Sequence, residues 1–263
     1  MEKKSSDTAS KVNNAFYDTL GERWVKAYDD PVALLRAEGE LKNPWIIQKI
    51  HQAFSTQNSV SKGPLKILDI GCGAGFLANA LSEQKFNVVG MDIAFGALKI
   101  AKQTDTTDRT GFAVADAYQL PFPDQYFDVV TSMDFLEHVE NPERVIAEAA
   151  RVLKPKGLFF FHTFNRNLLA YLVVVKGVEW FVKNTPKKMH VLPLFIKPKE
   201  LVAYGQKVGL EKVMIQGIMP DISKWAFWKL LVTRVVPKDF CFRFTPSLAI
   251  SYLGYAQKNQ IKK

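Results

Sequence analysis

The fold of this chain is decided by the stretch Leu65-Lys66-Ile67-Leu68-Asp69-Ile70-Gly71-Cys72-Gly73-Ala74-Gly75. An apolar run that is typical of a buried strand enters a glycine-rich turn, and a helical pattern begins at Phe76. Glycine adopts backbone angles that a Cβ forbids, and it lets a ligand approach the main chain. We therefore predict a pocket for a small cofactor at the carboxyl end of this first strand.

On both sides of this stretch, the sequence pattern indicates a layered fold. We predict strands at residues 65–70, 87–92, 111–115, 127–132, 157–163, 211–216 and 249–256. Helices are predicted between them at residues 76–83, 94–103, 142–153 and 198–208. Strands that alternate with helices predict an α/β fold, here a doubly wound, mostly parallel, seven-stranded Rossmann-like sheet.

Helical patterns also precede the sheet, at residues 12–27 and 44–53. In the second of these, Asn43 is the expected N-cap and Pro44 the first helical residue. A chain of 263 residues is long enough for one elaborate domain. We expect a single domain over 1–263, with an N-terminal helical segment (1–60), a cofactor-binding core (61–163) and cap insertions at 164–197 and 218–246.

Acidic residues next to the predicted strand ends indicate the kind of cofactor. Asp92 ends the second strand, where a carboxylate can accept hydrogen bonds from both hydroxyls of a ribose. Asp116 follows the third strand, where an adenine edge would lie. Asp69 precedes the Gly-x-Gly-x-Gly turn, and its charge would repel a pyrophosphate but attract a cationic amino-acid group. S-adenosylmethionine has such a group, a ribose and an adenine, so it is the predicted cofactor.

These residues, together with the run Phe127-Asp128-Val129-Val130, resemble the class I S-adenosylmethionine-dependent methyltransferases over residues 65–164. The predicted cofactor contacts are Asp69, Gly71, Cys72, Gly73, Gly75, Asp92, Ile93, Asp116, Ala117 and Met133.

A narrower resemblance rests on the run Met133-Asp134-Phe135-Leu136-Glu137-His138-Val139, and on residues 165–167, 186–190 and 195–198. These patches, and Arg23-Trp24 near the start, resemble the 3-demethylubiquinone 3-O-methyltransferases of ubiquinone biosynthesis. The resemblance implies methyl transfer to a phenolic hydroxyl of a polyprenylated quinone precursor. It also implies that Gly71, Asp92 and Met133 contact the cofactor.

His138 is the predicted catalytic residue. A phenol with a pKa near ~10 must lose its proton when it is methylated. His138 follows the fourth strand on the side where substrate should lie, so it is a candidate base or phenol-positioning group. The alternative is a structural role, in which His138 caps a helix or bonds the backbone. His51 and His162 are expected to be structural. His190 lies in the first insertion, in a loop able to close over the substrate, and we expect an exposed loop histidine there rather than a catalytic one.

Asp134, Glu137 and His138 are also a candidate site for Mg²⁺ or Zn²⁺. Their i, i+3, i+4 spacing would put all three side chains on one face of a helix. Oxygen and nitrogen ligands are compatible with both cations. The resemblance also permits such a cation in the reaction.

The first predicted insertion is strongly basic. Between Lys154 and Lys199 there are eight lysines and Arg166 against one acid, Glu179, within a chain whose formal net charge is +9. An apolar run at 168–175 and aromatic residues lie among these cations, and Trp225 begins a similar segment in the second insertion. Such a pattern is typical of a helix on an anionic bilayer, although a lid helix with a solvated basic face has the same pattern.

The composition limits the remaining classes. Cys72 and Cys241 are the only cysteines and no secretory signal is apparent at the N-terminus, so we expect a cytoplasmic protein, peripheral on the inner face of the membrane. Methylation of another small-molecule phenol or quinone is one alternative. RNA methylation is a weaker one, because the basic residues accompany an apolar stripe and no nucleic-acid-binding module is apparent. A non-catalytic, cofactor-binding partner in a biosynthetic complex is the other alternative.

Overall fold

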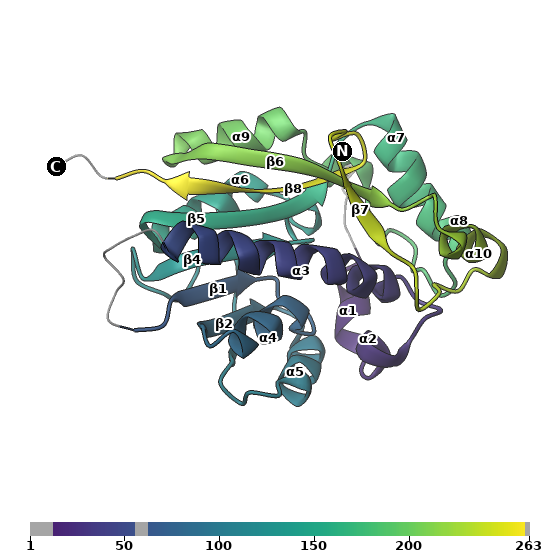
Figure 1. Cartoon of the computed structure of the whole chain (residues 1–263), viewed down its shortest axis with the longest axis horizontal. Helices are drawn as coiled ribbons and strands as arrows, with labels where there is room; N and C mark the ends of the chain where they lie inside the picture. Colours follow the sequence, from purple (N-terminus) through teal and green to yellow (C-terminus); the bar gives the residue numbers. More distant parts are fainter. Residues whose placement is uncertain (1–12, 56–62, 261–263) are drawn as a thin grey trace, which may run out of the picture.

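The computed structural model describes residues 13–55 and 63–260. In these residues, eight strands form one sheet in the order β3-β2-β1-β4-β5-β8-β6-β7 (Figure 1). The strands are β1 (Lys66–Ile70), β2 (Asn87–Asp92), β3 (Gly111–Val114), β4 (Phe127–Met133), β5 (Leu153–Phe164), β6 (Leu210–Pro220), β7 (Phe242–Thr245) and β8 (Ser251–Lys258). The predicted fold class is confirmed.

The first five strands are parallel, and the last three add antiparallel pairings. Leu68 on β1 pairs with Val89 on β2 and with Val130 on β4. β8 lies between β5 and β6 and is antiparallel to both. The predicted count of seven strands is wrong, because β7 pairs with the end of β6 inside the region predicted as the second insertion. β7 is a short edge strand, which leaves little periodicity for a sequence pattern to detect.

Helices cover both faces of the sheet. The α-helices are α1 (Ala15–Thr19), α2 (Arg23–Lys26), α3 (Val32–Ser55), α4 (Phe76–Glu83), α5 (Phe95–Thr104), α6 (Pro142–Val152), α7 (Leu168–Ala170), α8 (Val178–Phe181), α9 (Pro198–Lys207) and α10 (Trp225–Thr233). Short 3₁₀ turns lie at η1 (Leu136–His138) and η3 (Leu192–Leu194), and a π-helical segment, η2 (Tyr171–Gly177), joins α7 to α8. No helix within the described ranges combines the length and the apolar character that a membrane span requires.

The predicted N-terminal helices differ from those observed. The described part of the predicted helix 12–27 is broken into α1 and α2 near Gly21, whose φ is +51°; residues 1–12 and 56–62 lie outside the described residues. The predicted helix start at Asn43-Pro44 is wrong, because both residues lie inside the long helix α3. Pro44 removes one backbone N–H from that helix. Packing of Ile46 and Ile50, both fully buried, holds the helix across this interruption.

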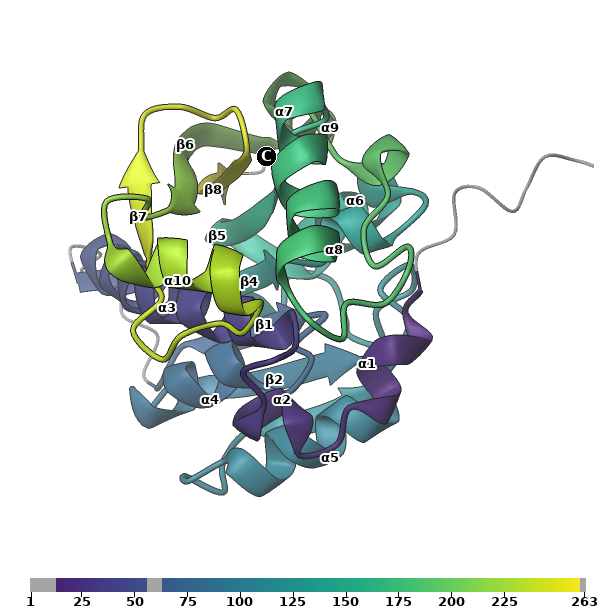
Figure 2. The ribbon, with the colours of Figure 1, turned by 90° about the vertical axis from the view of Figure 1, so that its right-hand side faces the viewer.

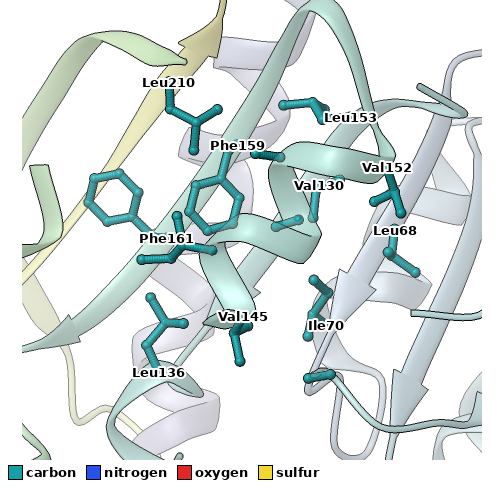
Figure 3. Packing of buried hydrophobic residues seen from close by; sticks show 14 of the residues in the cluster. Leu68, Ile70, Val130, Leu136, Val145, Val152, Leu153, Phe159, Phe161 and Leu210 are labelled. Atoms are coloured by element: carbon teal, nitrogen blue, oxygen red, sulfur yellow. The ribbon is translucent and has the colours of Figure 1, made fainter. Parts of the chain in front are cut away.

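The two faces of the sheet have separate cores because side chains alternate along each strand. Phe159 and Phe161 of β5 pack with α6 on one face (Figure 3). Phe160, between them, packs with α3 and α4 on the other face. Such continuous apolar runs are what parallel strands with two covered faces require.

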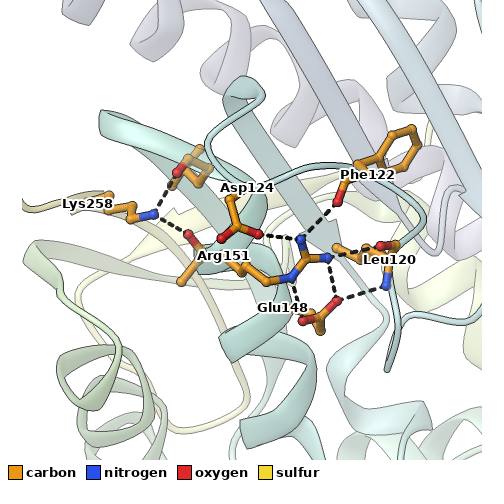
Figure 4. A network of polar contacts seen from close by, with 8 residues as sticks. Leu120, Phe122, Asp124, Glu148, Arg151 and Lys258 are labelled. Carbon is orange, nitrogen blue, oxygen red and sulfur yellow. Dashed lines mark hydrogen bonds and ion pairs between the residues drawn. The ribbon is translucent and has the colours of Figure 1, made fainter.

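Arg151 at the end of α6 fixes the proline-containing loop that enters β4. Its guanidinium donates to the carboxylates of Glu148 and Asp124, and to the carbonyl oxygens of Leu120 and Phe122 (Figure 4). These four partners surround one planar cation, which matches the fork geometry of arginine. The loop therefore enters β4 with a defined register.

The N-terminal helices and the two predicted insertions gather at one end of the molecule (Figure 2). The carboxylate of Asp18 accepts a 2.6 Å hydrogen bond from the Gly96 N–H at the start of α5. The Asn184 amide, between α8 and η3, donates to the Asp29 carbonyl at 2.9 Å. Residues 13–31 are therefore connected both to the sheet layer and to the region after β5.

Candidate active site

A cavity of about 530 Å³ lies at the carboxyl ends of β1, β2 and β4. This is the edge at which the strand order reverses, with β2 and β3 on one side of β1 and β4 and β5 on the other. In open α/β sheets, ligands bind at this place. Tyr17 and Trp24 from the N-terminal segment and His190 from the region after β5 also line the cavity.

The glycine turn forms the floor of this cavity and cannot tolerate larger side chains. Gly71 has φ +70°, and a Cβ at this position would lie 2.2 Å from the Phe135 ring. The N–H groups of Gly71 and Cys72 both donate to the Met91 carbonyl, which joins the turn to β2. Burial raises the pKa of the Cys72 thiol, so this cysteine is not an activated nucleophile.

Asp92 lies at the end of β2 and holds two backbone N–H groups. Its carboxylate oxygens accept 2.9 Å hydrogen bonds from Gly73 and from Ala94. Burial raises the pKa of Asp92, and these backbone hydrogen bonds act in the opposite direction. Asp116 is exposed at the cavity edge, where it accepts a 2.8 Å hydrogen bond from the Tyr118 N–H.

Asp69 is buried beneath the turn and is only 3% exposed. One carboxylate oxygen accepts a 2.6 Å hydrogen bond from the Thr131 hydroxyl. Burial raises the pKa of Asp69 to about 7, although the Thr131 bond opposes this shift. The residue therefore places a titratable negative charge next to the glycine turn.

Trp24 and Tyr17 cover the glycine turn on the side opposite to Asp69. A Cβ at Gly73 would lie 3.3 Å from the Trp24 ring, so the indole packs directly over the main chain of the turn. The two aromatic rings are stacked with centroids 5.7 Å apart, and the Trp24 indole N–H donates to the Tyr17 carbonyl at 3.0 Å. Sequence reasoning noted Trp24 only through a resemblance and missed Tyr17, because α1 is a short helix with no distinctive motif.

Asp134 belongs to a buried charge network that the sequence did not predict. Its backbone is left-handed, with φ +53°, and its two carboxylate oxygens bind Lys42 from α3 and His162 from β5. Lys42 is 3% exposed and also donates to Glu38 at 2.9 Å. Although burial acts to raise it, the pKa of Asp134 is held well below its usual range by Lys42 and His162. His162 is fully buried on β5, and its predicted structural role stays a prediction.

Glu137, His138 and His190 form a second cluster, separate from the network of Asp134. One ligand atom from each of the three lies within 4.8 Å of those of the others. Glu137 is fully buried; its Oε2 accepts a 2.8 Å hydrogen bond from Thr163, while its Oε1 has no partner among the described residues. The prediction that Asp134, Glu137 and His138 share one helical face is wrong. The helical turn covers only Leu136–His138, and the Asp134 side chain belongs to the other cluster.

His138 lines the cavity, and a neighbouring histidine from another part of the chain approaches it. The rings of His138 and His190 are 5.2 Å apart, and Phe164 lies 5.1 Å from His190. Burial lowers the pKa of His138 to about 4 and that of His190 to about 3. The prediction of an exposed His190 is wrong, because this side chain is partly buried and lines the cavity. His51, on α3, packs against Phe86, 5.3 Å away, in keeping with its predicted structural role.

The predicted cofactor contacts converge on this one cavity. Those that line it are Asp69, Gly71, Cys72, Gly73, Asp92, Ile93, Asp116, Ala117 and Met133. Gly75 is outside the set of described residues that line the cavity. It is the N-cap of α4 with φ +77°, and a Cβ there would lie 2.7 Å from Ala101.

Comparison with known proteins identifies the family. A family model described as "Methyltransferase domain" matches residues 68–161. The chain is 35% identical over 231 residues to a ubiquinone biosynthesis O-methyltransferase of Klebsiella pneumoniae (strain 342), over 85% of this chain and 87% of that protein. The chain belongs to the ubiquinone biosynthesis O-methyltransferase family. A second member, from Thiobacillus denitrificans, is 40% identical over 157 residues, 58% of this chain and 67% of that protein.

This methyltransferase thus uses S-adenosylmethionine and is an O-methyltransferase by family. Its fold is shared with more distant solved structures. Phosphoethanolamine N-methyltransferase 2 of Haemonchus contortus, solved with S-adenosylmethionine, has a TM-score of 0.53 at 18% identity, over 81% of this chain and 53% of that chain. The [4+2]-cyclase SpnF has a TM-score of 0.52 at 19% identity, over 82% and 80%. Proteins with this fold therefore carry out several chemistries.

Proposed function

We propose that this methyltransferase moves the methyl group of S-adenosylmethionine to a phenolic hydroxyl of a polyprenylated ubiquinone precursor, as in 3-demethylubiquinone 3-O-methylation. The observation that carries the proposal is that two sets of side chains line one cavity, which we assign to a cofactor half and an acceptor half. The glycine turn, Asp69 and Asp92 line one half, while His138 and His190 line the other. The two relatives described above are named as O-methyltransferases of ubiquinone biosynthesis, and we propose the same pathway for this chain.

The first half suits a cationic cofactor. The carboxylates of Asp69, Asp92 and Asp116 line it, and a sulfonium or ammonium group is attracted to such a cavity. We assign Asp92 to the ribose hydroxyls, Asp116 to the adenine edge, and the turn above Asp69 to the amino-acid group. Ile93, Ala117 and Met133 add contacts with the ligand, while Cys72 lies within the turn.

The second half suits an aromatic acceptor. Tyr17, Phe164 and Leu194 line it with the two histidines, so a phenol ring would meet apolar walls and a few polar atoms. Methyl transfer from a sulfonium is an in-line displacement, and positioning of the oxygen behind the methyl group lowers the barrier. We assign His138 to the acceptor oxygen, as its base or as the group that positions it.

A divalent cation is compatible with the acceptor half, although with different ligands from those predicted. Asp134 is engaged by Lys42 and His162, whereas Oε1 of Glu137 and Nδ1 of His138 lack partners in the described ranges. These two free acceptor atoms fit a Mg²⁺ or Zn²⁺ ion. When bound, such a cation would act as a Lewis acid and lower the pKa of the phenol.

Contact with an anionic membrane surface is the second part of the proposal, and it places the protein at the inner face of the membrane. Large apolar side chains are exposed in two segments whose helices α8 and α10 pack together: Leu168, Leu169, Leu172 and Trp180, and then Ile222, Trp225, Trp228 and Val232. Exposed lysines 183, 187, 224 and 229 lie in the same two regions. Apolar and cationic side chains together favour a lipid surface, where a polyprenyl substrate would reside.

A methyl-transfer assay with defined acceptors tests the reaction. The full chain is mixed with methyl-labelled S-adenosylmethionine and a panel of catechols with and without prenyl tails. We expect label on a phenolic oxygen, with the prenylated catechols preferred. His138→Ala should lower turnover by about 100-fold or more, because the acceptor oxygen loses its partner. His51→Ala is the control, since that histidine is not among the described residues that line the cavity and lies instead at a second, separate hollow.

Calorimetry measures whether the His138→Ala variant still binds S-adenosylmethionine. The dissociation constant should be the same within about twofold in His138→Ala, because the residue is assigned to the acceptor. Cofactor binding without label on any phenol would contradict the proposed reaction. Label on RNA bases under the same conditions would show a different acceptor class.

A further inference from the structure

We propose that the hydroxyl of Tyr17 donates a hydrogen bond to the acceptor oxygen and, with His138, holds that oxygen behind the methyl group. This inference rests on the proposed function and adds to it a catalytic residue from the N-terminal segment. Tyr17 belongs to the short helix α1, whereas most of the cavity is built by the ends of strands.

The position of the Tyr17 ring is the first argument. The ring lines the cavity and is stacked on Trp24, whose indole packs over the glycine turn of the cofactor half. Its other neighbour is His138, which we assign to the acceptor half; the two ring centroids are 5.5 Å apart and the planes lie at 84°. Tyr17 therefore contacts a residue of each half, and methyl transfer has to take place where the two halves meet.

The hydroxyl of Tyr17 has no hydrogen-bond partner in the part of the chain that the structure describes. No serine or threonine is among the described residues that line the cavity. The other tyrosine in that lining is Tyr118, whose hydroxyl accepts a 3.0 Å hydrogen bond from the Asn141 N–H. A polar group that is left without a partner in a cavity is available to a ligand.

Several other donors in the cavity lining are already engaged by the protein. The Lys42 ammonium donates to two carboxylates. The Trp24 indole N–H and the side-chain amides of Asn14 and Asn43 donate to backbone carbonyls. Tyr17 is thus an uncommitted donor next to the histidine that we assign to the acceptor oxygen.

Tyr17 suits the role of donor because it keeps its proton. A tyrosine hydroxyl has an ordinary pKa near ~10 and is protonated at neutral pH. Burial raises the pKa of Tyr17 further, and the charges of Glu137, Asp134 and Asp92 act in the same direction. The hydroxyl therefore donates a hydrogen bond to the acceptor oxygen and does not act as its base.

Contacts on both sides of Tyr17 hold α1 over the cavity. The carboxylate of Asp18 accepts the hydrogen bond from Gly96 at the start of α5, and a Cβ on Gly96 would lie 2.1 Å from the Asp18 carbonyl oxygen. Just before α1, the side-chain amide of Asn14 donates to the His138 carbonyl at 3.4 Å. The hydroxyl is thus fixed before the reaction, and a fixed donor needs little reorganisation as charge develops.

The hydrogen bond acts while the methyl group is transferred. A lone pair of the acceptor oxygen forms the new O–C bond as the bond between the methyl carbon and sulfur breaks, and the electron pair of that bond stays on sulfur. The phenolic proton passes to His138, and the Tyr17 hydroxyl keeps its own. A donor directed at the oxygen stabilises the negative charge that develops there and aligns the oxygen for the in-line displacement.

A spectroscopic titration tests the hydrogen bond without turnover. Nitrocatechol, whose visible absorption changes when it ionises, is bound to the full chain together with S-adenosylhomocysteine, and its apparent pKa is measured. Tyr17→Phe keeps the ring but should raise this pKa by about one unit relative to the parent, because the bound oxyanion loses a donor. Tyr28→Phe is the matched control, since Tyr28 is a partly buried tyrosine of the same segment and is not among the described residues that line the cavity.

Steady-state kinetics gives a second readout, which a merely structural role would not produce. At saturating S-adenosylmethionine, Tyr17→Phe should lower kcat by about 10–100-fold on a weakly acidic catechol and by less on nitrocatechol, since the more acidic phenol depends less on a donor. The dissociation constant of S-adenosylmethionine and the thermal unfolding midpoint should stay close to those of the parent. These two measurements separate the loss of a hydroxyl from a disturbed fold.

The proposal is supported if Tyr17→Phe raises the pKa of bound nitrocatechol while Tyr28→Phe leaves it unchanged. It is overturned if the probe has the same pKa in the parent and in Tyr17→Phe, or if it binds to neither. Loss of S-adenosylmethionine binding in Tyr17→Phe also overturns it, because the hydroxyl would then serve the cofactor.

The proposed function and this hydrogen bond fail in different ways. A parent that methylates no phenol, while Tyr17→Phe still raises the pKa of the probe, contradicts the reaction and supports the hydrogen bond. A parent that methylates phenols at the same rate as Tyr17→Phe, with the same probe pKa, contradicts the hydrogen bond and leaves the reaction standing.

Discussion

At the residue scale, the cavity is built around charged groups that the fold removes from water. Asp69 is the simplest case, because its carboxyl is 3% exposed and has the Thr131 hydroxyl as its hydrogen-bond donor. Burial raises its pKa from 3.8 to about 7 in the folded chain. A group with a raised folded pKa binds its proton more tightly in the native state than in the unfolded state.

This shift predicts a pH-dependent stability. The contribution of Asp69 is fully present below its unfolded pKa near 4 and is lost as the pH rises through about 7. We expect this residue to lower the free energy of unfolding by up to about 1.4 kcal/mol per pH unit across that interval. Urea unfolding at successive pH values, in the parent and in Asp69→Asn, measures it. Identical pH profiles for the two proteins would show that Asp69 has an ordinary pKa.

Gly71 gives a second prediction at this scale. Alanine at this position would meet the Phe135 ring and would hold a left-handed backbone at φ +70°. We expect Gly71→Ala to lower the free energy of unfolding by about 1–3 kcal/mol and to weaken S-adenosylmethionine binding. Gly111→Ala is the matched control, because its nearest atom would be 3.7 Å away without a positive φ. Equal stability of the two variants would contradict the assignment.

The sequence predicts some of these residues well and others not at all. The glycine turn and Asp92 were predictable because their chemistry depends on local spacing next to a strand. Lys42 and Glu38 were not, since nothing in a helical segment indicates which charge will face a strand end that lies ninety residues away. The burial of His190 beside His138 was not predictable for the same reason, because loop residues acquire their neighbours only through the tertiary fold.

At the element scale, α3 shows how packing overrides a local signal. Pro44 is favourable at the first position of a helix, and the sequence therefore predicts a start there. The observed helix continues through Pro44 because it buries Val32 and Ala33 before the proline, and Trp45, Ile46 and Ile50 after it. The continuous helix carries Lys42 to the cavity and Glu38 to a position where it accepts a hydrogen bond from Lys42.

The buried ion pair on α3 can be compared with an exposed ion pair of the same spacing at α2. Lys42 and Glu38 are an i, i+4 pair at 2.9 Å and are buried, whereas Lys26 and Glu22 have the same spacing at 2.8 Å and are exposed. Lys42→Met should lower the free energy of unfolding by about 3–5 kcal/mol, because the buried carboxylate of Glu38 and the partly buried carboxylate of Asp134 lose their cation. Lys26→Met should change it by less than about 1 kcal/mol.

Denaturant unfolding of these two variants checks the contrast. Raising the pH should not restore Lys42→Met, since its carboxylates remain charged. Similar, small effects of the two substitutions would show that Lys42 is solvated or that Asp134 finds another partner.

At the scale of the whole molecule, exposed apolar side chains and lysines occur together around α8 and α10. We predict that the protein sediments with liposomes that contain anionic lipid. The triple variant Lys183→Glu, Lys187→Glu and Lys188→Glu should bind these liposomes more weakly, since each lysine near an anionic surface contributes about 1 kcal/mol.

The control is a second triple variant with the same net charge. Lys85, Lys99 and Lys212 are also exposed but lie outside residues 164–197 and 218–246. Their replacement by Glu should leave sedimentation largely unchanged. Equal binding of the parent and both triple variants, or equal loss in both, would contradict a specific membrane-facing surface.

The order of the strands has a consequence for how the chain is made. β8 lies between β5 and β6, so the sheet cannot be completed until residues 251–258 are present. During synthesis, β6 therefore leaves the ribosome before the strand that joins it to β5 exists, with part of its edge unpaired. At about 5–20 residues per second this exposed interval lasts for seconds. During that interval the unpaired strand edge can bind chaperones or aggregate. The sheet is completed when β8 inserts between β5 and β6.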